Sequence, residues 1–484
     1  MAKQSIKQNY IYNVVFQLFS LLAPVITMPY VSRVFEADFI GYYSYANSIA
    51  TYFSIFAALG IASYGAREVS IHREDRSYCS QTFWELTIIR IFTTVFCLIA
   101  FLIAVAINGV NVSVYLACGI MILSVAFDFT WFLQAMEDFR GLMIRNLIIK
   151  AVSVVCIFLF IHKKDDLALY ITIQTGSTLL ANLLTIPRIK KYLIKTNKHG
   201  LNLFQHLRQI MVYFIPVIAG SVYTVLDRTM IGILTRDTLE NGYYEQGHRV
   251  ITLLLTVTTS LNVIVGMRTS YLFGQGEDTA IKKYIRKTFE FMCLVSMPMI
   301  FGIVGCARNF VPIFFGAGYD KVAPVIMLFS PIVFIIGISN IIGSLYLTPS
   351  GQRSKANRAI LIGAGINFVL NLLLIPIFKS YGAVVASLLA EGVIALMYIS
   401  FMRQYLTLWD FFKASLKYVA IASVMLVAVY LIGRDWHTPT ALIVQVAVGA
   451  AIYIAGLFIT RNKIVFEEIK NFKARLLKKG AGNE

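Results

Sequence analysis

The sequence carries little charge for its length. Only 14% of its 484 residues are Asp, Glu, Lys or Arg, whereas soluble domains carry about 25%. The hydrophobic share is 58%, and the mean hydropathy is +0.72. A soluble core cannot bury this much apolar sequence, so these values exclude a soluble globular protein. They predict an all-α integral membrane protein.

Acidic residues are especially scarce, at 25 against 43 Lys and Arg, which gives a net charge of +18. The basic residues lie in short clusters between apolar runs, a distribution that fits loops facing anionic lipid. We therefore expect the lipid bilayer as a partner and exclude nucleic acid.

Cysteine and histidine are also few. The six cysteines form no CxxC pair, and the six histidines form no pair at metal-ligand spacing. We therefore expect free thiols, no metal site, no cofactor and no catalytic residues. No predicted outer loop is long enough to form a catalytic domain, so a membrane enzyme such as a polymerase or glycosyltransferase is disfavoured.

Long apolar runs dominate the rest of the chain. A helix needs about 20 apolar residues to cross the bilayer. We predict about fourteen transmembrane helices, near residues 10–32, 39–64, 84–107, 113–135, 142–161, 167–187, 210–234, 247–271, 289–307, 322–347, 358–378, 382–402, 415–433 and 438–460.

The loop charges predict the orientation of these helices. With the N-terminus in the cytoplasm, 31 of the 43 Lys and Arg fall on the inner side and 8 on the outer side. This bias predicts that both termini are cytoplasmic. Residues 190–209 and 461–484 alternate basic and apolar residues, so we expect both to be amphipathic helices on the inner leaflet.

Two short phrases recur six spans apart. PVI stands at 24–26 and 216–218, and GYY stands at 41–43 and 242–244. An even separation implies parallel repeats related by an axis along the membrane normal. We therefore predict an N-lobe at 1–189, a basic linker at 190–209 and a C-lobe at 210–404. A helix pair at 405–460 and a tail at 461–484 follow.

Basic residues near several span ends are counted with the loops, and four others are taken to lie within the membrane: Arg90, Lys150, Arg228 and Arg249. A cation in hydrocarbon costs at least a few kcal/mol, so such residues normally face a wet cavity or a partner. We predict that they line a cationic cavity between the lobes and bind an anionic substrate. The alternatives are local pairing with a carboxylate and, for Lys150, snorkelling to the interface.

Several other charged residues are candidates for supporting roles. Buried carboxylates can exchange a proton, bind sodium or neutralise a nearby arginine. Adjacent helix residues do not face each other, so we do not expect Asp227 to pair with Arg228. The coupling or counter-ion candidates are Asp227, Asp128 and Glu391, and the gate candidates are Arg33, Glu36 and Arg67.

Longer phrases resemble a known family across essentially the whole chain. They are "NVVFQLFSLLAPVITMPYVSRVF", "GYYSYANSIATYFSIFAALGIASYGARE", "DFTWFLQAMEDFRGLMIRNLIIKAVSV", "VLDRTMIG" and "NFVLNLLLIPIFKSYGAVVASLLAE". The chain resembles the polysaccharide repeat-unit flippases (Wzx type) of the multidrug/oligosaccharidyl-lipid/polysaccharide exporter superfamily. The resemblance implies a MATE-like fold of two six-helix lobes plus a C-terminal helix pair.

The resemblance also implies a cargo and a location. The expected substrate is a polyprenyl-pyrophosphate-linked glycan, flipped across the bacterial plasma membrane by alternating access for O-antigen, capsule or exopolysaccharide synthesis. Coupling to a proton or sodium gradient and contact with the polymerase machinery are further implications. A lipid II flippase and a drug or metabolite antiporter of the same fold are the alternatives.

Overall fold

The computed structural model describes residues 6–194, 202–259, 269, 271–275, 277–434, 436, 438–462 and 464–467. Side chains are described from residue 19 onward within these ranges, apart from 216, 217, 219 and 221–224. All regular structure in the described residues is helical, which confirms the all-α prediction. Most of the predicted tail, 461–484, lies outside the described residues.

The helices group into two compact units. The first contains residues 1–245 together with 371–383, and the second contains 246–370 and 384–484. The helices of the first unit are α1 Ile6–Val34, α2 Ala37–Ala58, α3 Ile61–Ile71, α4 Arg76–Asn108, α5 Val112–Ala126, α6 Thr130–Ala135, α7 Phe139–Phe160, η1 Lys164–Asp166, α8 Leu167–Leu183, α9 Ile186–Ile189, α10 Phe204–Thr235 and the start of α11 Thr238–Thr259.

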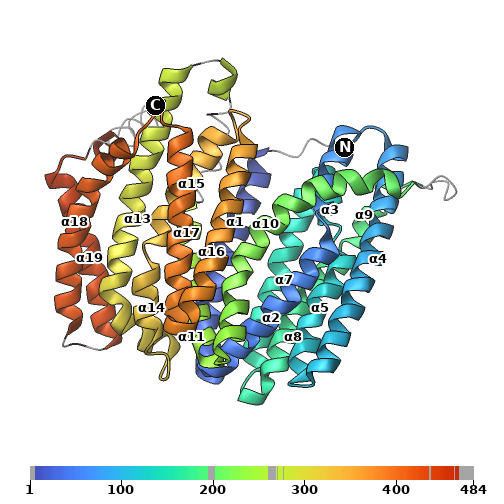
Figure 1. Ribbon diagram of the computed structural model, residues 1–484, viewed down its shortest axis with the longest axis horizontal. Helices are drawn as coiled ribbons and strands as arrows, with labels where there is room; N and C mark the ends of the chain where they lie inside the picture. Colours follow the sequence, from blue (N-terminus) through green and yellow to red (C-terminus); the bar gives the residue numbers. More distant parts are fainter. Residues whose placement is uncertain are drawn as a thin grey trace, which may run out of the picture. The chain divides into compact units, whose positions relative to one another are not determined.

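The second unit continues α11 and contains the C-terminal helices. Its core joins α13, α15, α17, α18 and α19 through buried side chains such as Phe289, Tyr398 and Tyr418. In Figure 1, α18 and α19 stand side by side next to α13. The helices are α13 Asp278–Phe315, α14 Val322–Phe329, α15 Ile332–Ile342, η3 Gly343–Leu347, α16 Arg353–Phe378, α17 Ser380–Phe401, α18 Leu408–Arg434 and α19 Pro439–Ile459. The end of α16 and the start of α17, within residues 371–383, belong to the first unit.

Eleven helical segments in the described residues are long and apolar enough to cross a membrane. The protein is therefore a multi-pass membrane protein, although the predicted count of fourteen is not confirmed. The remaining predicted spans, 10–32, 210–234 and 247–271, overlap α1, α10 and α11. These helices are not among the eleven, because the first half of α11 is polar and because α1 and α10 contain residues whose side chains are not described.

Several predicted spans are interrupted helices. The predicted span 39–64 is divided into α2 and α3 at Leu59 and Gly60, whose φ angles of 45° and 71° are left-handed. Glycine adopts this conformation without a steric penalty, which allows the chain to turn there. The predicted span 113–135 is divided into α5 and α6, and 322–347 into α14, α15 and η3.

The first unit packs its helices around two apolar clusters. One lies among α1, α2, α4, α5, α7 and α8 and includes Phe35 and Phe101. The other lies at the ends of α3, α4 and α6 and includes Trp131 and Phe132. Figure 1 shows α4, α5, α7 and α8 side by side. These clusters fix the helices that carry the charged groups described below.

The two GYY phrases meet each other in space. A Cβ added to Gly41 of α2 would lie 1.8 Å from the carbonyl oxygen of Thr238. A Cβ added to Gly242 of α11 would lie 1.9 Å from the carbonyl oxygen of Ala37. Thr238 and Ala37 each lie four residues before the glycine of their own helix, so the contact is reciprocal. This reciprocity is what a local two-fold relation between α2 and α11 requires.

The close contact predicts that Gly41 tolerates no side chain. Gly41→Ala should lower the melting temperature of the purified protein in detergent, because overpacking a tight contact costs about 1–3 kcal/mol. The matched control is Gly176→Ala in α8, where an added Cβ meets open space. That variant should be unchanged or slightly more stable, since Ala favours a helix over Gly by about 1 kcal/mol. Equal melting temperatures for Gly41→Ala and wild type would contradict the contact.

Candidate functional site

An ion pair joins α10 and α11 within the first unit. Nε of Arg228 lies 2.8 Å from Oε2 of Glu245, and the two side chains are only 18% and 7% exposed. The hydroxyl of Ser44 on α2 donates a hydrogen bond of 3.1 Å to the same carboxylate oxygen. Removing one partner of such a buried pair costs about 3–5 kcal/mol. The pair therefore fixes three helices at one point.

Asp227, the residue before Arg228, has its own partners. Its carboxylate accepts a hydrogen bond of 2.5 Å from the Tyr244 hydroxyl and one of 2.7 Å from the Asn371 side-chain amide. The Asn241 amide donates to the backbone carbonyl of Arg228 at 2.9 Å. Asp227 and Arg228 thus have separate partners, as the sequence predicted for adjacent helix residues.

A second acidic group lies at the start of α11. The buried carboxylate of Glu240 accepts hydrogen bonds from the backbone and the hydroxyl of Ser380, at 3.2 and 2.7 Å. Lys379 reaches Asp237 at 3.0 Å and Glu240 at 3.8 Å. The hydrogen bond from Lys379 to Asp237 raises the pKa of Lys379. Lys379 therefore stays charged throughout the physiological pH range.

These groups lie along α10 and α11, and we call them together the α10–α11 network. Its charged side chains are four carboxylates and two cations, which differs from the predicted excess of positive charge. For Arg228, the alternative to lining a cavity was local pairing with a carboxylate. Its 2.8 Å contact with Glu245 is such a pairing. The charged members are Asp227, Asp237, Glu240, Glu245, Arg228 and Lys379.

Arg90 occupies a different place in the first unit. Its side chain is 1% exposed, and its guanidinium donates a hydrogen bond to the backbone carbonyl of Asp128. Asp128 lies between α5 and α6, where helix ends leave carbonyls without intrahelical partners. The Asp128 carboxylate accepts from the backbone and the hydroxyl of Thr130, at 3.1 and 2.5 Å. Arg90 thus stabilises the interruption between these helices.

The other predicted charges lie on three further helices. Lys150 on α7 and Arg249 on α11 are both half-buried, and Glu391 on α17 is 9% exposed. Arg249 and Glu391 belong to the second unit, whereas Lys150 belongs to the first. The predicted site residues therefore do not form one cluster within either unit.

The candidate gate residues lie at helix ends. Arg33 is exposed and donates to the backbone carbonyl of Pro29 at 3.1 Å. Glu36 is exposed and pairs with Lys164 of η1 at 2.5 Å. Arg67 on α3 is exposed. In the first unit, then, Glu36 is bonded to a neighbouring helix end, and Arg33 to its own helix.

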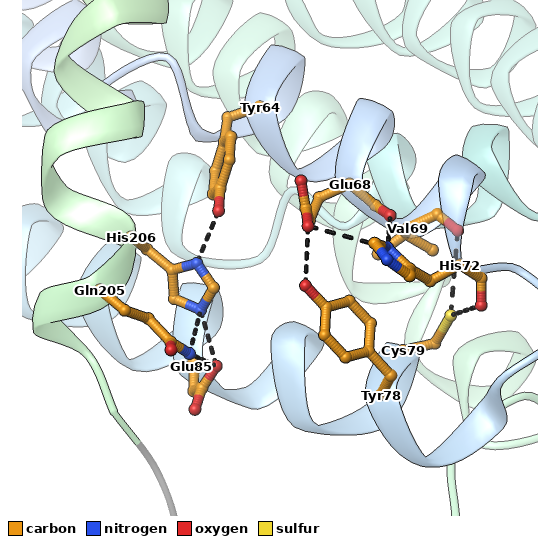
Figure 2. Close-up of polar contacts among 9 residues, drawn as sticks. All are labelled: Tyr64, Glu68, Val69, His72, Tyr78, Cys79, Glu85, Gln205 and His206. Carbon is orange, nitrogen blue, oxygen red and sulfur yellow. Dashed lines mark hydrogen bonds and ion pairs between the residues drawn. The ribbon is translucent and has the colours of Figure 1, made fainter.

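A buried histidine forms the best-defined polar cluster near the start of α10. Nε2 of His206 lies 2.6 Å from Glu85 of α4, and Nδ1 lies 2.7 Å from the hydroxyl of Tyr64 of α3. Figure 2 shows His206 between these two side chains, with Gln205 donating to Glu85 at 3.1 Å. The backbone of Asn202 also donates to Glu85, at 2.8 Å. Glu85 thus holds the chain that enters α10 against α3 and α4.

Figure 2 also shows a neighbouring group that ties α3 to α4. The Tyr78 hydroxyl donates to Glu68 at 2.7 Å, and the His72 ring lies near the same carboxylate at 3.7 Å. The thiol of Cys79 donates to the His72 carbonyl at 3.2 Å. These contacts are local and structural.

Sequence reasoning missed three important residues. Glu240 and Glu245 fall in a stretch that we predicted as an outer loop before residue 247, but α11 begins at Thr238. That prediction was wrong because buried partners satisfy the polar residues of this turn. The signal was the dense polar run TLENGYYEQ next to a span. His206 lies in the basic linker 190–209, which we expected to be an amphipathic helix. Residues 195–201 of this linker lie outside the described residues, and 204–209 form the first turns of α10. The buried partners of His206 were not predicted.

Thiols and metal ligands add no further site in the described part of the chain. The six cysteines are free, and all except the half-buried Cys156 are buried. Among the described residues, no three His, Cys, Asp or Glu side chains come together in a way that could hold a metal ion. The polar chemistry of the first unit is therefore concentrated in the α10–α11 network and the His206 cluster.

Comparisons with known sequences agree on one family. The pattern of the family described as "Polysaccharide biosynthesis protein" matches residues 6–269, more than half of the chain. The "Putative O-antigen transporter" of Escherichia coli (strain K12) is 21% identical over 417 residues, covering 83% of this chain and 97% of that protein. The "Probable low-salt glycan biosynthesis flippase Agl15" of Haloferax volcanii is 23% identical over 274 residues, covering 56% of each.

Solved structures agree on the fold. "Lipid II flippase MurJ, inward closed conformation" matches with a TM-score of 0.72 at 16% identity, covering 95% of this chain and 99% of that one. An inward-facing multidrug resistance MATE family transporter of the MOP superfamily matches with a TM-score of 0.60 at 12% identity, covering 83% and 94%. The predicted MATE-like fold and the resemblance to this superfamily are confirmed. The chain belongs to the polysaccharide biosynthesis protein family, a family of transporters and flippases rather than enzymes.

Proposed function

We propose that this protein is a flippase that moves a polyprenyl-pyrophosphate-linked oligosaccharide repeat unit from the cytoplasmic to the outer leaflet of the bacterial plasma membrane. Its family and the names of its relatives support a glycan cargo. The observation that carries most of the proposal is the Arg228–Glu245 ion pair, a fixed cation held in the packed interior between α10 and α11.

The chemistry of the cargo calls for such a cation. A pyrophosphate must leave water to cross the membrane, and the guanidinium of arginine binds phosphate oxygens in a bidentate manner. In our account, the pyrophosphate displaces the Glu245 carboxylate from Arg228. Glu245 keeps its hydrogen bond from Ser44, and uptake of a proton by Glu245 would reduce the net charge of Arg228, Glu245 and the doubly charged pyrophosphate from −2 to −1. This exchange offers a chemical route to coupling with a proton gradient.

The other charged candidates take secondary parts in the proposal. Arg249 on α11 is the second pathway cation, and Lys150 on α7 is a cation met on the cytoplasmic side. The contact of Arg90 with the Asp128 carbonyl favours a structural role for Arg90. Asp227 and Glu391 remain candidates for ion coupling.

Alternating access needs a contact that opens. The contact of α2 with α11 is suited to this because its glycines allow close packing without interlocked side chains. Asp38 of α2 accepts a hydrogen bond from the Thr238 hydroxyl beside it. By the predicted orientation, this contact closes the outer end. Parting α2 from α11 would release the cargo outside, while both termini remain cytoplasmic.

A lipid II flippase is a second candidate because of the fold match with a TM-score of 0.72. Lipid II and the proposed cargo share a polyprenyl pyrophosphate and differ in the attached sugars and peptide. Proteoliposomes that contain each lipid separately distinguish the two candidates. The proposed function predicts faster translocation of the peptide-free oligosaccharide lipid.

The proposal predicts that a neutral pair at positions 228 and 245 folds but does not transport. Replacing a buried ion pair with apolar residues of similar volume is often neutral or stabilising, so Arg228→Met with Glu245→Leu should keep its melting temperature. Translocation of the oligosaccharide lipid should fall at least about tenfold, which corresponds to about 1.4 kcal/mol in the barrier. Protection of the glycan from an external lectin in proteoliposomes measures the rate.

The matched control for this variant is Arg358→Met, which removes an exposed arginine from α16 and should transport normally. The single variants Arg228→Met and Glu245→Leu should both be less stable than the double variant. Normal translocation by the folded double variant would refute the role of Arg228.

The proposed opening of the contact between α2 and α11 can also be tested. Asp38→Cys with Thr238→Cys should form a disulfide, since the native side chains are hydrogen-bonded. Oxidation should stop translocation by holding α2 against α11, and a reducing agent should restore it. Each single cysteine variant, treated in the same way, is the control. Undiminished transport by the fully cross-linked protein would show that this contact does not open.

A further inference from the structure

A cavity of about 570 Å³ lies in the first unit, apart from the Arg228–Glu245 pair. This volume falls within the range of about 300–1,000 Å³ typical of small-molecule sites. The first turns of α2, α5 and α8, together with η1 and the first residue of α11, form its wall. The lining residues are Asp38, Phe39, Tyr42, Asn111, Ser113, Val114, Lys164, Asp165, Leu167, Ala168 and Thr238.

The lining residues include hydrogen-bonding groups and an aromatic ring, which are the groups that bind sugars in proteins. Asp38 and Asp165 offer carboxylate acceptors, and Asn111 and Ser113 can both donate and accept. A sugar ring presents hydroxyls of both kinds together with an apolar C–H face. The ring of Tyr42 can cover such a face, because aromatic side chains combine a large apolar surface with a polar tip.

Neighbouring contacts hold these groups in place before any ligand arrives. The Tyr42 ring packs edge-to-face on Tyr115, with centroids 6.0 Å apart. Asp38 is oriented by the Thr238 hydroxyl. Lys164 is paired with Glu36 at 2.5 Å. Binding a ligand here therefore requires little ordering of side chains, and ordering is one of the main costs of binding.

The charge of the wall limits which sugars fit. The lining includes two carboxylates, those of Asp38 and Asp165, and one lysine, Lys164, which is paired with Glu36. An acidic sugar would place a third carboxylate beside them, and like charges at short range repel. Neutral sugars avoid this repulsion, and a protonated amino sugar is attracted by the two carboxylates.

We propose that this cavity is a saccharide-binding site for neutral or amino sugars. The identity of its glycan rests on the proposed function, because every lining segment lies at a predicted outer loop or at the helix turns beside it, where a flipped glycan would emerge. The sugar could belong to the exported lipid-linked unit or to free polysaccharide outside the cell. Binding of a saccharide in this cavity depends on the residues that line it and does not require transport.

Saccharide binding can be measured without transport. Purified full-length protein in nanodiscs is titrated with maltotriose, with the amino disaccharide of chitosan and with digalacturonate, and binding is read by saturation-transfer NMR. We expect the first two to bind with a Kd of about 1 mM and digalacturonate to bind at least tenfold more weakly. Tyr42→Ala and Asn111→Ala should each weaken maltotriose binding at least fivefold. Tyr284→Ala, which removes an exposed tyrosine outside the cavity, is the matched control.

The proposal is overturned if no saccharide binds, if digalacturonate binds as well as maltotriose, or if Tyr42→Ala binds like Tyr284→Ala. Adding the polyprenyl-linked oligosaccharide to the nanodisc identifies the source of the glycan. Competition with maltotriose assigns the site to the exported unit, and lack of competition assigns it to free polysaccharide. Failure of the flippase proposal is seen separately, as saccharide binding without translocation in proteoliposomes.

Discussion

In the proposed function, transport depends on one interaction, the Arg228–Glu245 ion pair. A charge among apolar helices must be neutralised by a fixed partner, and the same solution recurs through the first unit. Asp227 is held by Tyr244 and Asn371, and Glu85 is held by His206 and the backbone amide of Asn202. The Arg228–Glu245 pair differs in joining two opposite full charges, so an anionic cargo can replace one of them.

The close packing of α2 against α11 determines the position of Glu245 in this ion pair. Gly41 and Gly242 let α2 and α11 approach until no Cβ fits between them. Ser44 and Glu245 lie three residues after these glycines, about one helical turn along. The close approach therefore brings the Ser44 hydroxyl within 3.1 Å of the Glu245 carboxylate. The glycine contact and the charged site are thus one arrangement, in which a movement of α2 against α11 also changes the surroundings of Arg228.

The sequence predicted the helical fold and the family because hydropathy and the long phrases are properties of continuous segments. It also equated the two GYY phrases, which face each other in the structure. It did not predict that α11 begins at Thr238 or that Glu245 pairs with Arg228, because those residues are polar and their burial depends on partners distant in sequence. His206 was missed for the same reason: its partners lie 121 and 142 residues away. The predicted cationic character of the site did not include these carboxylates.

The most direct test of the account is whether the pyrophosphate replaces Glu245 at Arg228. Solid-state NMR can measure dipolar coupling between ¹⁵N-labelled arginine side chains and the ³¹P of a bound polyprenyl-pyrophosphate oligosaccharide. The account predicts ¹⁵N–³¹P coupling in the wild type that disappears in Arg228→Lys, with weaker coupling of Arg228 to ¹³C-labelled glutamate carboxyls once the lipid binds. Unchanged arginine–glutamate coupling with no ³¹P contact, in protein saturated with the lipid, would contradict it.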